Sequence, residues 1–301
     1  MNARAPLAGA DDAAFAPASS VPATSWRDGR HEDGSELLAE EVPVALVYNG
    51  ISHAVMLASP QDLEDFAVGF SLSERIVRSA RDVRGVEAEA GPHGIALAID
   101  IAPGAMARLK GTRRARLGKT GCGLCGIDSL AWFERETAPD ERQPPDACAA
   151  RAGDARDAGD SFAPEALQRA MAAMAGRQRL HQATGAMHAA GWADRDGRLL
   201  LVREDVGRHN ALDKLVGALA RAGIDAGGGC ALVTSRASFE MVQKAARAGM
   251  GLLAAISAPT AMAVRLADRA GLTLAGFVRG GRHVVYTHPW RLAPRAVVHG
   301  S

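Results

Sequence analysis

"CALVTSRASFEMVQKAARAGMGLLAAISAPTAMAVRLADRAGLTLAGFV", residues 230–278, decides the fold of this chain. Short apolar runs alternate here with helical runs that carry capping residues, so strands are expected over 230–235, 250–257 and 272–278, with helices over 238–249 and 259–271. Strands joined through helices form β-α-β units. The stretch therefore predicts an α/β domain with a mainly parallel sheet.

The same pattern begins earlier in the chain. A helix is expected at "FAPEALQRAMAAMAG" (162–176), a strand at "GRLLLVRED" (197–205) and a helix at "NALDKLVGALARAG" (210–223). The methionine stripe of Met171 and Met174 is interpreted as core packing. We assign this domain to residues 161–292.

A smaller α+β unit is expected over residues 35–118. "EVPVALVYNGISHAVML" (41–57) places Asn49-Gly50 between two apolar runs, a strong hairpin signal. Ser59 and Pro60 suggest the N-cap and first residue of a helix, and a further strand is expected over 95–101. The remaining segments are a disordered leader (1–34), a cysteine loop with a helix (119–135) and a charged insert (136–160) that contains Cys148, interpreted as an incidental thiol.

Composition limits the classes of function. The 301 residues carry a net charge of +1, which argues against a polycation for nucleic acid, and no apolar run is long enough for a membrane span. Four cysteines do not make a disulfide framework in a chain of this length. We expect a cytoplasmic protein that binds neither nucleic acid nor membrane.

The cysteine loop "KTGCGLCGID" (119–128) is the sharpest chemical feature. A structural zinc site needs four ligands, and Cys148 and Cys230 stand alone, so no metal is expected within one chain. A thioredoxin-like dithiol would follow a strand. Preceding cations and a following helix favour thiolates at Cys122 and Cys125, which suits sulfur transfer.

Two stretches suit an anionic ligand. "EDVGRHNALDK" (204–214) places Arg208 and His209 at a strand-to-helix turn, which reads as an anion site or as a capped turn. "GFVRGGRHV" (276–284) flanks a Gly-Gly turn with arginines, as a phosphate or pyrophosphate site would.

His188 is expected at a helix start, as a hydrogen-bonded residue or a ligand contact. A zinc deaminase is not expected, because Ala189 and Ala190 stand where the general-acid Glu should follow such a histidine. The Cys-x-x-Cys also comes before His188 and follows Gly121 rather than proline.

Eight stretches, in order over about residues 36–292, carry a resemblance: "EVPVALVYNG", "LEDFAVGF", "CGLCG", "TGAMHAA", "EDVGRHNALDK", "SRASFEMVQKAARAG", "SAPTAMAVRLADRAGLTLAGFVRG" and "YTHPWRL". Together they resemble the FdhD/NarQ family of formate dehydrogenase accessory sulfurtransferases. Gly121, Ala186 and Arg75 depart from the residues usual in that family.

The resemblance implies a homodimer that accepts persulfide sulfur from a cysteine desulfurase. It further implies transfer of that sulfur to the bis(molybdopterin guanine dinucleotide) molybdenum cofactor, a bound substrate that a guanine nucleotide is expected to mimic, for use by formate dehydrogenase. It implies a cytidine-deaminase-like C-terminal domain without the deaminase zinc. Cys122 matches the persulfide-bearing residue and Cys125 its loop partner. The cofactor-binding segment matches Phe277, Val278, Arg279, Gly280, Gly281 and Arg282.

Two further hypotheses stay open. A non-catalytic chaperone would bind and deliver the cofactor without using its cysteines. A zinc-bridged oligomer would take thiolates from the cysteine loops of two subunits.

Overall fold

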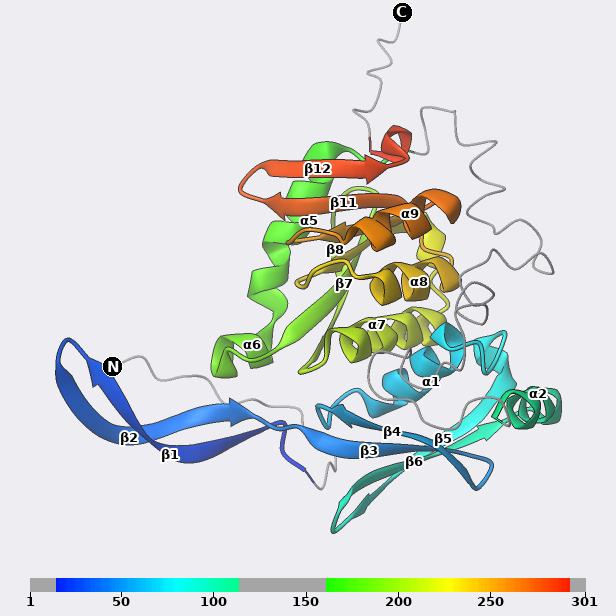
Figure 1. Ribbon diagram of the computed structural model, residues 1–301, viewed down its shortest axis with the longest axis horizontal. Coiled ribbons are helices and arrows are strands. Elements are labelled where there is room, and N and C mark those ends of the chain that lie inside the picture. The colour runs from blue at the N-terminus through cyan, green and yellow to red at the C-terminus, as the bar shows by residue number, and fades with distance from the viewer. Residues whose placement is uncertain (1–14, 114–160, 293–301) are drawn as a thin grey trace, which may run out of the picture.

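The computed structural model describes residues 15–113 and 161–292 and contains three β-sheets (Figure 1). A two-stranded ribbon, β1-β2, precedes a four-stranded sheet of order β4-β3-β6-β5. The C-terminal part holds a six-stranded sheet of order β12-β11-β10-β9-β7-β8. No helix in the described ranges is both long and apolar enough to cross a membrane.

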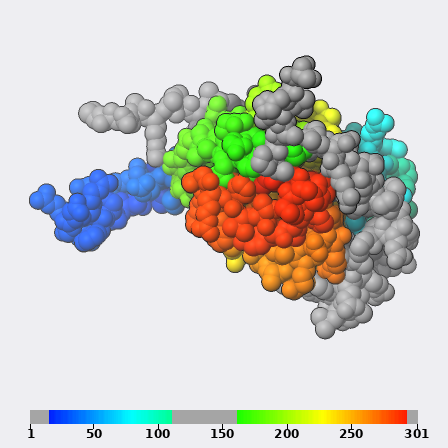
Figure 2. Space-filling model, turned by 90° about the horizontal axis from the view of Figure 1, so that it is seen from above, coloured from blue at the N-terminus to red at the C-terminus, as the bar shows by residue number. Residues whose placement is uncertain are grey.

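The ribbon consists of β1 (Ala18–Arg27) and β2 (Arg30–Ala39) joined by a tight turn at Asp28 and Gly29. It projects from the body in two perpendicular views (Figures 1 and 2). The expectation of a disordered leader over 1–34 is therefore wrong for residues 18–34. A ribbon exposed along most of its length needs no alternating apolar face, so its sequence lacks the periodicity that would have predicted it.

The four-stranded sheet contains the predicted hairpin. β3 (Val42–Tyr48) and β4 (Ile51–Ala58) are antiparallel, and Asn49 and Gly50 take φ values of 46° and 78° as a type I′ turn requires. β6 (Gly94–Ile101), also predicted, runs parallel to β3 and pairs with β5 (Val83–Gly91). Helices α1 (Leu63–Ser73) and α2 (Pro103–Arg113) complete the unit, with α1 packing on the sheet.

Helix α1 begins later than the sequence suggested. Ser59 is not its N-cap: α1 starts after Asp62, which has a φ of 52° and makes no capping bond. The backbone N–H of Ser59 instead donates to Asp205 Oδ2 (3.0 Å), and its hydroxyl accepts from the Val206 N–H (3.2 Å). Residues 59–62 are thus a linker held by the larger domain.

The six-stranded sheet is mixed, so the prediction of a mainly parallel sheet is wrong. Only the pairs β9-β10 and β10-β11 are parallel, whereas β7-β8, β7-β9 and β11-β12 are antiparallel. β7 and β12 were not predicted as strands, and each is joined to a neighbour by a short hairpin. The strands are β7 (His188–Asp194), β8 (Leu199–Asp205), β9 (Gly229–Val233), β10 (Leu252–Ala255), β11 (Thr273–Arg279) and β12 (Arg282–Thr287).

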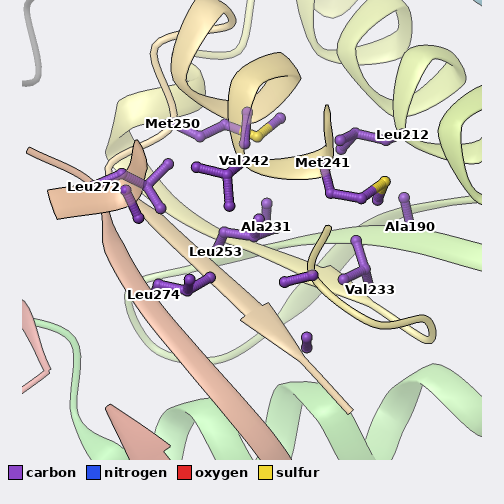
Figure 3. Packing of buried hydrophobic residues seen from close by; sticks show 14 of the residues in the cluster. Ala190, Leu212, Ala231, Val233, Met241, Val242, Met250, Leu253, Leu272 and Leu274 are labelled. Atoms are coloured by element: carbon purple, nitrogen blue, oxygen red, sulfur yellow. The ribbon is translucent and has the colours of Figure 1, made fainter. Parts of the chain in front are cut away.

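Helices cover both faces of this sheet. Leu232 and Ala254 pack toward α5 (Pro164–Arg177), which buries Leu167, Met171 and Met174 as expected of the methionine stripe. Neighbouring strand residues point to the opposite face and meet α7 (Arg208–Ala222), α8 (Phe239–Arg247) and α9 (Ala261–Arg269). In Figure 3, Leu212, Met241 and Val242 of these helices lie over Ala231, Val233, Leu253 and Leu274 of the sheet. A short helix, α6 (Arg179–Thr184), leads into β7. The likeness to cytidine deaminases stays a prediction.

Helices α1 and α7 join the two units by direct backbone contact. A Cβ atom built on Gly69 of α1 would lie 1.7 Å from the Asp213 carbonyl oxygen of α7. One built on Gly217 of α7 would lie 1.9 Å from the Asp65 carbonyl oxygen of α1. Reciprocal glycines therefore permit a crossing that any side chain would block.

We predict that Gly69→Ala lowers the free energy of unfolding by about 3 kcal/mol or more, because the helices must separate to admit the methyl group. Chemical denaturation measures this change. Gly176→Ala is the matched control, since no atom lies within 4 Å of its would-be Cβ in α5, and it should be neutral or gain about 0.5 kcal/mol. Equal stability of the two variants would contradict the crossing.

Candidate functional site

One edge of the six-stranded sheet collects the N-termini of three helices. β9, β10 and β11 are parallel, and β8 runs in the same direction because both β8 and β9 are antiparallel to β7. Their carboxyl ends therefore meet at one edge, where β8 leads into α7, β9 into α8 and β10 into α9. Ligands of open α/β sheets bind at such an edge, and helix N-termini offer N–H groups to anions.

Asp205 organises the turn between β8 and α7. Its Oδ1 accepts the Gly207 N–H (2.8 Å) and the Asn210 side-chain amide (3.0 Å), and its Oδ2 pairs with Lys214 Nζ (2.7 Å). The Asp205 and Lys214 side chains are fully buried. A buried pair of this kind is costly to break, because the remaining charge loses its partner.

The same residues hold the linker from the smaller unit. Asn210 Nδ2 donates to the Leu57 carbonyl (2.8 Å), and Lys214 Nζ donates to the Ser59 carbonyl (3.0 Å). Within "EDVGRHNALDK", the side chains of Asp205, Asn210 and Lys214 thus stabilise the turn and the linker. Arg208 and His209 are the members of the predicted anion site that these contacts leave for a ligand.

Arg208 and His209 occupy the first turn of α7. His209 Nε2 lies 2.8 Å from Glu240 Oε2 in the first turn of α8, without the alignment of a hydrogen bond. Arg208 Nε and Ser238 Oγ are buried without a hydrogen-bond partner among the described residues. Buried polar groups left without partners destabilise a protein, and a phosphate oxygen that reached either atom would supply its missing partner. These residues therefore fit a phosphate-bearing ligand.

His188 lies beside this turn, at the start of β7, where it pairs in register with Asp205. The expectation that it begins a helix is wrong: α6 ends at Thr184, Gly185 takes a left-handed conformation, and the chain then enters β7. Partial burial lowers the pKa of His188, and the charges of Arg208, His181 and His209 lower it further. The His188 ring is therefore a neutral neighbour of Arg208 at neutral pH.

The other predicted set lies on the turn between β11 and β12. Phe277, Gly280 and Gly281 take φ values of 54°, 57° and 74°, and the Arg282 guanidinium carbon lies 5.9 Å from the centre of the Phe277 ring. Arg279 is the residue opposite Arg282 in the ladder. Val278 is fully buried in the core beneath α5, so its side chain is not available to a ligand.

This hairpin is fixed to the same sheet edge. The Phe277 N–H donates to the Ser257 carbonyl (3.2 Å), and a Cβ on Gly276 would lie 2.9 Å from Pro259 Cδ. The base of the hairpin therefore abuts the loop between β10 and α9. Since β11 and β8 are separated by β10, β9 and β7, the two predicted sets span about 19 Å along the edge. That span suits an elongated ligand.

Cys122, Cys125 and Cys148 lie outside the described residues, as do segments 119–135 and 136–160. Within the described ranges, no group of three or more His, Cys, Asp or Glu side chains could hold a metal ion. This finding does not test the zinc-bridged oligomer. Cys230 is buried in the core, and burial raises the pKa of its thiol, which disfavours the reactive thiolate.

Ser238 and Glu240 were missed by the sequence analysis. Their signal was present in "TSRASFE" (234–240), where polar residues follow a strand and open a helix. Nothing in that pattern distinguishes a ligand site from ordinary helix capping, and only the approach of α8 to α7 brings Glu240 to His209.

Comparisons with known proteins agree with this architecture. The model of the FdhD/NarQ family matches residues 39–293. Sulfur carrier protein FdhD of Cupriavidus necator is 55% identical over 96% of this chain and 95% of its own length, and that of Variovorax paradoxus is 53% identical over 86% and 88%. A crystal structure from Desulfotalea psychrophila, described as a formate dehydrogenase accessory protein, aligns with a TM-score of 0.66 and 22% identity over 92% of this chain and 100% of that one. At this identity the structural likeness shows the fold alone.

We predict that His188 titrates below the ordinary histidine pKa of 6.5 and that bound pyrophosphate raises this pKa, because the anion offsets Arg208. NMR titration of the imidazole, assigned with His188→Gln, measures both values.

Since the unfolded chain binds the proton more tightly, His188 lowers the stability of the folded protein as pH falls through 6.5. His188→Gln should therefore lose less thermal stability between about pH 7 and about pH 5. A midpoint above 6.5 in the free protein would contradict the environment described.

Proposed function

The chain belongs to the FdhD/NarQ family, and from this premise we propose that it is a sulfur carrier for formate dehydrogenase. In this proposal it accepts persulfide sulfur from a cysteine desulfurase and transfers it to the bis(molybdopterin guanine dinucleotide) molybdenum cofactor. The reaction makes it a sulfurtransferase acting through a cysteine persulfide. Its cysteine content, which suits a reducing compartment, supports a cytoplasmic location.

The buried, unsatisfied donors at the helix N-termini carry this proposal. Arg208 Nε and Ser238 Oγ lie at an edge that also presents His209, and each would gain a partner from a phosphate oxygen. A guanine dinucleotide supplies phosphates along an elongated body, which suits the span from α7 to the β11-β12 turn.

The β11-β12 turn would hold the other end of the substrate. Arg279 and Arg282 can each bind a phosphate through two parallel N–H bonds. Gly280 and Gly281, both at positive φ, keep the turn free of side chains, so that an anion can approach the backbone N–H groups. The side chain of Val278 takes no part, because it is buried.

The proposed chemistry resides on Cys122. Its thiolate attacks the outer sulfur of the desulfurase persulfide, the donor's S–S bond breaks, and the donor cysteine leaves as a thiolate. The new persulfide on Cys122 then releases its outer sulfur to the bound cofactor as hydrosulfide, when the Cys125 thiolate attacks the inner sulfur, the persulfide S–S bond breaks and a Cys122–Cys125 disulfide forms. Cys125 assists this release or protects the persulfide.

A non-catalytic chaperone is the second candidate. It is favoured by the fact that the phosphate-binding features belong to residues far from the cysteines in sequence and need no thiol. The two candidates differ in whether sulfur passes through the protein.

We predict that Cys122→Ala abolishes the gain of one sulfur atom in mass when the protein is incubated with a cysteine desulfurase and cysteine. Mass spectrometry of the intact protein measures this gain, and formate dehydrogenase activity in a strain lacking the endogenous gene measures its consequence. Cys148→Ala, the matched control, should behave as the wild type. If the double variant Cys122→Ala with Cys125→Ala still supported the dehydrogenase, the chaperone would replace the sulfur carrier.

We also predict that Arg208→Gln and Arg282→Gln each weaken binding of guanosine diphosphate by about tenfold or more, because each loses a charge-assisted contact to phosphate. Isothermal titration calorimetry measures the affinities. Arg265→Gln on the exposed side of α9 is the control and should bind as the wild type. Unchanged affinity in both site variants would place the nucleotide elsewhere.

A further inference from the structure

Two consecutive β-α units of the six-stranded sheet have the same construction. One runs from β9 into α8 and the next from β10 into α9, and the two helices lie side by side (Figure 1). The helices begin at residues 239 and 261 and end at residues 247 and 269, a constant offset of 22 residues. Each ends on an alanine with φ of −80° and ψ of 0°, followed by a glycine at positive φ. The two units therefore form a short repeat that can be compared position by position.

The N-termini of α8 and α9 occupy equivalent places in adjacent units. Ala237 and Pro259 form a parallel β-bridge, and the Thr260 N–H donates to the Ala237 carbonyl (3.1 Å). The N-cap residues are Ser238 for α8 and Thr260 for α9, which again lie 22 positions apart. Each unit thus places one hydroxyl group at the same point of its helix.

The two hydroxyl groups are used differently. Thr260 Oγ1 accepts from the Ala263 N–H (3.2 Å), as an N-cap side chain normally does. The Ser238 side chain makes no capping bond to α8, and its Oγ is buried without a hydrogen-bond partner among the described residues. A buried hydroxyl in that state lowers the stability of the ligand-free chain. It is expected where the hydroxyl and the N-terminus of the helix serve a ligand instead.

The two units also differ in charge. Arg236 and Glu240 of the first unit correspond to Ala258 and Met262 of the second. Arg236 is exposed, and within the described ranges no residue pairs with its guanidinium group. The Glu240 carboxylate would repel an anion, but it lies 2.8 Å from His209 Nε2 of α7, a ring that offsets this repulsion when it is protonated. The first unit alone therefore offers a cation to an anionic ligand.

The loop between β9 and α8 lies in the middle of the candidate site. In the order β11-β10-β9-β7-β8, β9 stands two strands from β11 and two from β8, about 10 Å from each. The cations of the β11-β12 turn mark one end of this span, and Arg208 marks the other. An elongated anion bound at both ends passes the loop that carries Arg236 and Ser238.

We propose that Arg236 and Ser238 bind a central phosphate of the ligand, between the groups bound at α7 and at the β11-β12 turn. The Arg236 guanidinium donates two parallel N–H bonds to the phosphate oxygens, and the Ser238 hydroxyl donates a third bond. The α9 unit takes no part, because Thr260 caps its helix and Ala258 stands in place of the arginine. This inference rests on the proposed function, since it names further residues that hold the same phosphate-bearing substrate.

Binding of pyrophosphate and of guanosine diphosphate, each measured by isothermal titration calorimetry, tests the assignment. Arg236→Gln should weaken both affinities about tenfold or more, because a charge-assisted contact to phosphate is lost. Ser238→Ala should weaken them about fivefold, the usual effect of losing one hydrogen bond. The melting temperature of ligand-free Ser238→Ala should be unchanged or slightly raised, because the hydroxyl that it removes has no partner there.

Thr260→Ala is the matched control at the equivalent position of the repeat. It removes the hydroxyl that caps α9, so it should lower the melting temperature by about 2–4 °C. Both affinities should stay at the wild-type values. The two alanine variants therefore separate ligand binding from helix capping, because each should show the effect that the other lacks.

The outcomes distinguish this inference from the proposed function. Wild-type affinities in Arg236→Gln and Ser238→Ala, together with weakened binding in Arg208→Gln and Arg282→Gln, would overturn the central phosphate site and leave the proposed function standing. A loss of stability in Ser238→Ala equal to that in Thr260→Ala would overturn it too, because the hydroxyl would then serve its own helix. A wild-type protein that binds neither pyrophosphate nor guanosine diphosphate would overturn the central site and the proposed function together.

Discussion

The close crossing of α1 and α7 is the constraint on which the rest of the structure depends. Gly69 and Gly217 let the two backbones touch, and this contact fixes the four-stranded sheet against the six-stranded one. Backbone contact also brings buried charges within reach of partners on the other helix. Asp65 of α1 accepts from Arg221 of α7 (2.6 Å) and from Arg203 of β8 (2.7 Å).

A second buried network forms at the other end of the same helix pair. Asp213 of α7 accepts from Ser73 at the end of α1 (2.6 Å) and pairs with Lys244 of α8 (2.9 Å), which also reaches Glu74 (3.0 Å). Each of these groups is satisfied only if both units are in place. Separating the two units would leave buried charges without partners and would also expose apolar surface. Their relative position is therefore rigid.

Structural features set by neighbouring residues could be predicted from the sequence, whereas features set by residues far away in the chain could not. Asn49-Gly50 predicted its hairpin because a type I′ turn is a property of those two residues alone. Arg75, which departs from the residue usual in the family, takes a φ of 56°, a conformation that favours glycine. Ser59 looked like a helix cap because its competing partner, Asp205, lies 146 positions away. Similarly, "GRHVVYT" has no helix before it to signal β12, which exists because a Gly-Gly turn returns the chain along β11.

The candidate site combines, within a single motif, residues whose contacts are local and residues whose contacts depend on distant parts of the chain. "EDVGRHNALDK" suggested anion binding as a whole, yet Asp205, Asn210 and Lys214 are committed to the turn and to the linker at Leu57 and Ser59. Those contacts hold the first turn of α7 in place, and that turn presents Arg208 and His209. The structural and chemical halves of the motif are therefore coupled. A change at the domain linker would move the cations even though it touches no ligand, because the carboxylate that fixes Ser59 also fixes the N-terminus of α7.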